Sequence, residues 1–181
     1  MEKTFVQMMR ESLQSAHETL EGTMQGATEE VLHWQPQGKA LPVGAAYAHA
    51  VISEDLMLSG MVRKTKSLLD QGWIEKLGLS HPHPMMDESW EKNFAEWAKT
   101  VKMDLPKFKE YAKAVYKQSD EYLGTLTDKD LSEKKVDLSG WGLGEWSLGK
   151  FVMRLLMGHM DNLTGEVSAA KGLQGLKGYP F

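Results

Sequence analysis

The segment SLGKFVMRLLMGHMDNLTGEVSAAKG, residues 147–172, carries a complete helix signal from its first residue to its last. Ser147 is typical of an N-terminal helix cap, because its hydroxyl can accept a hydrogen bond from a free backbone N–H of the first turn. Gly172 is typical of the residue that ends a helix, since glycine adopts the left-handed conformation at little cost. We therefore expect a helix to about Lys171. The residues expected on its inward face are Leu148, Val152, Leu155, His159, Leu163 and Ala170.

Three other segments show apolar residues at helical spacing. They predict long helices over residues 5–20, from Pro42 to about Leu69, and from Asp104 to just before Gly124. Proline is favoured in the first turn of a helix, which supports the second and third starting points. Four long helices joined by shorter elements predict an all-α fold, a four-helix bundle in one domain spanning residues 1–181.

The connections between the long helices contain shorter predicted elements. Thr28 and Thr127 are each expected to cap a single helical turn, and Asp87 a somewhat longer helix. That longer helix has an apolar stripe formed by Trp90, Phe94, Trp97 and Val101. The segment Val136–Trp146 is too rich in glycine for a helix and predicts a short hairpin or an ordered loop. No internal repeat stands out.

The composition excludes several classes of partner. With 41% hydrophobic and 25% charged residues, the 181-residue chain falls in the ordinary globular range. The net charge is −4 and basic residues form no stripe, so we expect no nucleic-acid partner. No apolar run approaches the ~20 residues that span a bilayer, so we expect no membrane span.

The residues also bear on redox environment and location. Cysteine is absent, which excludes disulfides, thiolate metal ligands and a cysteine nucleophile within this sequence. The first residues lack the apolar core of a secretion signal. We therefore expect a cytoplasmic protein.

Two histidines near the middle of predicted long helices are the principal candidates for chemistry. His49 lies on a face of the second helix that is rich in small residues, which favours close helix packing or, alternatively, a cavity. His159 lies on the inward face of the last helix, and Leu163 follows one turn later. A third metal ligand would be expected at that i+4 position, which lies about 6 Å along the axis on the same face. Leucine cannot ligate a metal.

Three interpretations of this histidine pair remain open. The simplest is that His49 and His159 are core side chains, hydrogen-bonded to one another, to Asn162 or to Ser53. The second is a metal-free ligand pocket lined by His49, His159, Asn162 and Leu163. The third is a residual metal site with an unidentified third ligand. A further run, His81-Pro82-His83-Pro84, is read as an extended loop rather than a metal site, since two surface imidazoles seldom complete a coordination shell.

A set of short motifs resembles one protein family. The motifs are Trp34-x-Pro36, His49 followed by Glu54, Trp146-Ser147-Leu148, His159, and Gly165-Glu166-Val167. In this order they resemble the DinB/YfiT-like superfamily. The resemblance implies a DinB-like four-helix bundle with down-up-up-down topology, often assembled as a homodimer. It also implies a divalent metal held by one histidine of the second helix and a His-x-x-x-His pair of the last.

The functional hypothesis depends on the third metal ligand of the family, which this chain lacks. His49 and His159 match two of the family's three metal ligands, while the third position is Leu163. Characterised relatives include thiol-dependent transferases and isomerases. We therefore predict a degraded or metal-free family member with a small-molecule pocket near His49 and His159. The alternative is a transferase or isomerase that depends on a divalent ion, such as nickel or zinc, and on a thiol cofactor. Whether the protein is an enzyme stays open at this stage.

Overall fold

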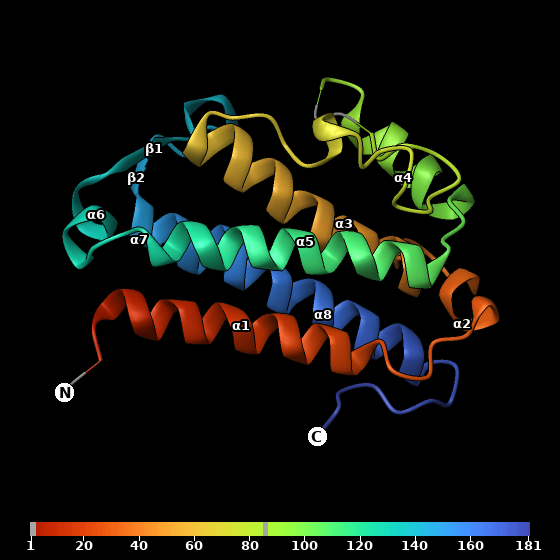
Figure 1. Ribbon diagram of the computed structural model, residues 1–181. Helices are drawn as coiled ribbons and strands as arrows, with labels where there is room; N and C mark the ends of the chain where they lie inside the picture. Colours follow the sequence, from red (N-terminus) through yellow and green to blue (C-terminus); the bar gives the residue numbers. More distant parts are fainter. Residues whose placement is uncertain (1–2, 85–86) are drawn as a thin grey trace.

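The computed structural model describes residues 3–84 and 87–181, and four long helices form its framework (Figure 1). They are α1 (Phe5–Thr23), α3 (Val43–Leu56), α5 (Leu105–Gly124), and α7 (Leu148–Phe151) continued into α8 (Gly158–Gly172). Helices α1 and α8 run in one direction, and α3 and α5 run in the other (Figure 1). The all-α bundle and its down-up-up-down topology are thus confirmed. None of these described helices is long and apolar enough to cross a membrane.

The shorter elements lie at the two ends of the bundle. Helices α2 (Glu29–His33) and α4 (Trp90–Thr100) lie at one end, and α6 (Asp128–Glu133) lies at the other (Figure 1). Strands β1 (Lys135–Asp137) and β2 (Glu145–Ser147) pair antiparallel beside α6. The predicted alternatives for this glycine-rich segment are therefore resolved in favour of a hairpin. Short 3₁₀ turns occupy η2 (Leu69–Gln71) and η3 (Ser139–Trp141).

The predicted helix caps were mostly right. The side chains of Thr28, Asp104, Thr127 and Ser147 each accept a hydrogen bond from the backbone N–H three residues later. The prediction for Asp87 was wrong: its carboxylate accepts from the backbone and hydroxyl of Ser89, and the helix begins only at Trp90.

The second long helix ends earlier than predicted. It continues from α3 into the π-helical segment η1 (Met57–Arg63) and stops there instead of reaching Leu69. Lys64 has φ 53°, a left-handed conformation that ends a helix. A lysine in the sequence does not indicate that conformation. The spacing of apolar residues therefore predicted a helix end beyond the observed one.

A second π-helical segment, η4 (Val152–Met157), shifts the inward face of the last helix. The N–H of Gly158 bonds to the carbonyl of Met153, five residues earlier, so one extra residue fits into the turn. Leu156 and Met160 are each 1% exposed, whereas the predicted inward residues Leu155 and His159 are only partly buried. The remaining predicted positions, Leu148, Val152, Leu163 and Ala170, are buried.

One connection occurs twice, although no repeat was predicted. In each case a threonine-capped short helix packs on a glycine of the next long helix. A Cβ on Gly44 would lie 3.1 Å from the Leu32 carbonyl oxygen, and a Cβ on Gly149 would lie 3.1 Å from that of Leu131. Glycine suits both positions because a Cβ would make a tight contact with the backbone of the short helix, which would have to shift.

Candidate functional site

His49 and His159 lie at the seam between α3 and α8. Their ring centroids are 5.1 Å apart with the planes nearly perpendicular. Both side chains are half-buried. The bundle side of α3 instead carries Glu54 and Asp55, which are 1% and 0% exposed. The structure thus brings the two predicted histidines together, at the edge of the buried core.

A third imidazole completes this cluster: His83, which the sequence analysis assigned to an extended surface loop and not to this site. The Nε2 atom of His83 lies 3.0 Å from Nδ1 of His49, and the rings are nearly parallel. The Nδ1–H of His83 donates to the carbonyl of Pro84 at 3.0 Å, because a carbonyl can only accept. In a neutral His83 the lone pair is therefore on Nε2, which accepts from the Nδ1–H of His49. Ser53, one of the expected partners, lies 3.2 Å from the same nitrogen.

Aromatic side chains of α4 cover the imidazoles. The ring of Phe94 lies 4.6 Å from that of His49, and the ring of Trp97 lies 4.8 Å from that of His83. Trp90 stacks on Phe94 and extends this wall. The predicted apolar stripe of α4 is therefore the cover of the histidine cluster.

This cover keeps the imidazoles uncharged. Burial, with smaller contributions from His159 and His83, lowers the pKa of His49 to about 3. Burial lowers the pKa of His83 to about 4, although its bond to the Pro84 carbonyl opposes the shift. Burial also lowers the pKa of His159. At neutral pH the cluster is therefore a set of neutral donors and acceptors.

The two other predicted pocket residues differ in their surroundings. Leu163 is 4% exposed and belongs to the apolar core between α3 and α8. Asn162 is exposed and makes no hydrogen bond to a described residue. Neither side chain completes a polar site around His49 and His159.

The residues present do not fit the three-ligand metal centre that the resemblance implies. Over residues 3–84 and 87–181, no group of three or more His, Cys, Asp or Glu side chains is placed to hold a metal ion. His83 brings a third imidazole, but its lone pair already accepts from His49. The position that would supply the remaining ligand is the buried Leu163.

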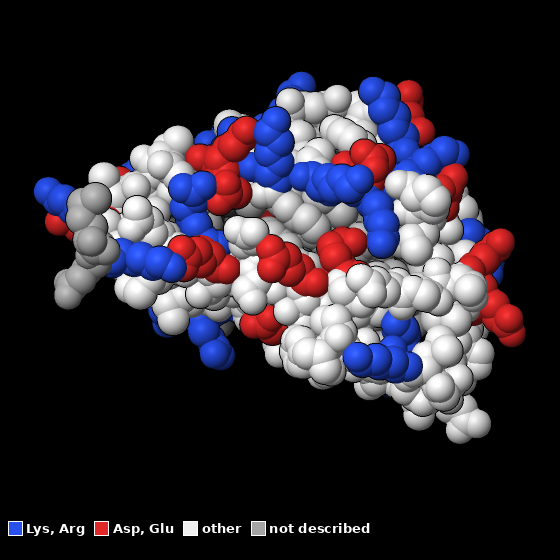
Figure 2. Space-filling model, turned by 60° about the horizontal axis from the view of Figure 1, so that its bottom comes forward, with Lys and Arg blue, Asp and Glu red and all other residues white. Residues whose placement is uncertain are grey.

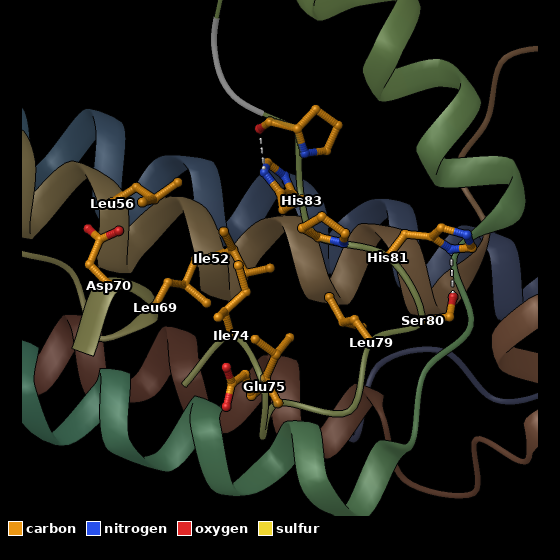
Figure 3. A pocket seen from close by; sticks show the side chains of 13 residues that line it. Ile52, Leu56, Leu69, Asp70, Ile74, Glu75, Leu79, Ser80, His81 and His83 are labelled. Carbon is orange, nitrogen blue, oxygen red and sulfur yellow. Dashed lines mark hydrogen bonds between the residues drawn. The ribbon is translucent and has the colours of Figure 1, made fainter. Parts of the chain in front are cut away.

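A cavity of about 360 Å³ adjoins the cluster and shares His83 with it (Figure 3). It lies between α3 and the segment that follows η1. Apolar side chains face one another across it, and Asp70 and Glu75 lie toward its rim, as Figure 3 shows. At its other end the Ser80 hydroxyl bonds Nδ1 of His81 at 2.8 Å. The apolar lining is formed by Ile52, Leu56, Leu69, Ile74, Leu77 and Leu79.

One buried carboxylate fixes the outer wall of this cavity. Asp55 accepts hydrogen bonds from the backbone N–H groups of Leu68 and Leu69 at 3.0 and 3.2 Å. It also accepts one from the hydroxyl of Tyr111 at 2.9 Å. Asp55 thus joins α3 and α5 to the chain segment that forms the wall.

The glycine-rich hairpin is not part of this site. Strands β1 and β2 lie at the end of the bundle opposite α4 (Figure 1). The cover over the histidines is formed by the aromatic side chains of α4.

Comparisons with known proteins agree with this architecture. A family model described as the DinB superfamily matches residues 12–162. Among solved structures, the chain is similar to a crystal structure of a conserved protein from Enterococcus faecalis, with 21% sequence identity and a TM-score of 0.78. That alignment covers 95% of this chain and 98% of the other. No curated protein matches.

Proposed function

The chain belongs to the DinB superfamily, and we propose that it is a metal-free member that binds a small molecule beside the histidine cluster. The observation that carries this proposal is the cavity that ends at His83, whose Nε2 is bonded to His49. A pair of imidazoles that satisfy each other needs no metal ion. In this proposal the positions that would ligate a metal in the family have a structural role, because they hold the wall of the cavity in place. The neighbouring cavity binds the ligand.

The cavity lining favours a small and largely apolar ligand. Its volume of about 360 Å³ is at the lower end of the range typical of ligand sites. Apolar side chains from α3 and from the facing segment would cover the body of the ligand. A polar group on the ligand could bond near Ser80 and His81, where the lining is polar.

A cavity-filling substitution tests the location. Leu79→Phe adds volume to the lining, so fragments that bind the wild type in ligand-observed NMR should lose affinity. Leu173→Phe is the matched control, because Leu173 is 68% exposed and does not line the cavity. Equal binding by both variants would place the ligand elsewhere.

The competing function is a transferase or isomerase that depends on a divalent metal and on a thiol cofactor. The observation in its favour is His83, a third imidazole beside the two family positions. Protein purified without a histidine tag should then contain stoichiometric nickel or zinc, and His49→Ala should abolish it. Thiol-dependent turnover of a test electrophile by the same preparation would decide for this function.

Location and assembly form a separate part of the proposal. The sequence leads us to propose a cytoplasmic homodimer that does not bind nucleic acid. Light scattering after gel filtration tests the homodimer, and a mass of 20.4 kDa, that of one chain, would contradict it.

A further inference from the structure

The two carboxylates at the rim of the cavity beside His83 have no basic counterpart in its lining. The lining includes Asp70 and Glu75, and no lysine or arginine is among its described residues. His83 adds no positive charge at neutral pH, because burial lowers its pKa to about 4. The field of the two carboxylates therefore favours a cation over an anion at this rim.

Neither carboxylate is paired with a basic side chain elsewhere in the described part of the chain. Each ion pair found there joins other residues. Glu75 is exposed and makes no hydrogen bond to a described residue. On the face of the molecule in Figure 2, by contrast, acidic and basic side chains lie next to one another. The negative charge at the rim is thus available to a ligand.

Asp70 is held in place before any ligand binds. Its Oδ2 atom accepts from the backbone N–H and the hydroxyl of Ser67 at 3.3 and 2.7 Å, while Oδ1 accepts from no described residue. The neighbouring N–H groups of Leu68 and Leu69 are bonded to the buried Asp55. A charge fixed in this way needs little ordering when a ligand binds, which favours affinity.

The apolar part of the lining is open to a ligand. Ile74 is 53% exposed, and Leu56 and Leu69 are half-buried. Figure 3 shows these apolar side chains around the cavity and both carboxylates toward its rim. A short apolar chain can therefore lie in the cavity while a charged group at its end stays in contact with water. Keeping the charge hydrated avoids most of the cost of burying it.

We propose that this cavity selects ligands that carry an ammonium group on a short apolar chain. The chain lies against Leu56, Leu69 and Ile74, and the ammonium group stays at the rim, attracted by the carboxylates of Asp70 and Glu75. This inference rests on the proposed function, since it assigns a ligand class to the same cavity. It goes further because it assigns the sign of the ligand's charge, which an apolar lining alone leaves open.

Three probes with the same hexyl chain length test the ligand class on the wild-type protein. Hexylamine is positively charged at neutral pH, 1-hexanol is uncharged and hexanoate is negatively charged. Exposed ion pairs are modest, so we expect hexylamine to bind about three- to tenfold more tightly than 1-hexanol, and hexanoate to bind most weakly. At 1 M salt the Debye length falls to about 3 Å, so this preference should shrink. NMR titration of the leucine and isoleucine methyl groups measures the three affinities, and equal affinities would overturn the proposal.

A double variant without the two charges tests whether the rim causes the preference. D70N/E75Q nearly keeps the size of both side chains and should bind hexylamine and 1-hexanol with similar affinity. D161N/E166Q is the matched control, because Asp161 and Glu166 are exposed, lie on α8 and do not line the cavity. It makes the same change in net charge and should keep the preference. An amine preference that persists in D70N/E75Q, or one that disappears in both double variants, would overturn the proposal.

Leu79→Phe separates failure of this inference from failure of the proposed function. Equal affinities for the three probes, each weakened by Leu79→Phe, would refute the ligand class and leave the cavity as a binding site. No binding, or affinities that Leu79→Phe leaves unchanged, would refute both. If D70N/E75Q does not fold, Glu75→Gln, which breaks no described hydrogen bond, should still reduce the preference for hexylamine. An undiminished preference in that variant would overturn the proposal.

Discussion

Replacing Asp55 by asparagine should destabilise the protein and loosen the wall of the cavity beside His83. One carboxylate oxygen of Asp55 accepts from the backbone N–H of Leu68, and the other accepts from Leu69 and Tyr111. An asparagine side chain keeps only one acceptor oxygen, and its NH₂ group would face at least one of these donors. Each buried donor left without a partner costs about 1–3 kcal/mol. We therefore expect the free energy of unfolding to fall by about 2–4 kcal/mol.

Urea unfolding and thermal unfolding, both monitored by circular dichroism, measure this change. For a chain of this size, about 1 kcal/mol corresponds to a shift of about 2–4 °C, so Tm should fall by about 4–16 °C. Amide exchange at Leu68 and Leu69 should also become faster, while exchange within α3 changes less. Asp161→Asn is the matched control, because Asp161 is exposed and accepts no hydrogen bond from a described residue. A change of less than about 0.5 kcal/mol for Asp55→Asn would refute this account of the wall.

Three further substitutions or conditions test the fold and the cluster. Because burial lowers the pKa of His49 to about 3 and that of His83 to about 4, the unfolded chain, whose imidazoles titrate near ~6.5, takes up protons first. The free energy of unfolding should be highest above about pH 6.5 and should fall below that pH by up to ~1.4 kcal/mol per pH unit for each histidine. In urea unfolding between pH 7 and 5, His49→Phe should therefore show a smaller decline in this free energy than the wild type. Ser147→Ala should lower the unfolding free energy by about 1 kcal/mol in the same assay, because it removes the cap of α7; no change would mean that the cap is dispensable. Gly149→Ala should cost about 1–3 kcal/mol, since its Cβ would lie 3.1 Å from the Leu131 carbonyl oxygen, and a neutral result would show that α6 moves away freely.

Much of the fold follows from local signals in the sequence. The caps at Thr28, Thr127 and Ser147 were identified because hydroxyl groups satisfy free N–H groups at helix starts, and the helix start at Asp104 was identified from the proline that follows it. The π-helical segments were not predicted, because an extra residue in a turn depends on packing between helices and has no local signature. This is why His159 lies at the edge of the inward face and Met160 lies at its centre.

The site was predicted only in part. Spacing and the family resemblance identified His49 and His159, which do lie together. His83 was missed because it reaches the cluster through an irregular loop, where sequence spacing carries no geometry. The alternation of His and Pro in residues 81–84 was the one available signal for His83, since proline favours an extended loop. The roles of the buried Glu54 and Asp55 depend on α1 and α5, which the sequence of α3 cannot show.

The position of Leu163 gives the most direct test of the metal-free site. Wild-type protein purified without a histidine tag should carry no stoichiometric metal and bind nickel and zinc weakly in calorimetric titration. Leu163→His restores the i+4 pair with His159 and should bind the same ions far more tightly, and His49→Ala in that background should remove the gain. Stoichiometric, tight binding by the wild type that is lost in His49→Ala would contradict the metal-free site.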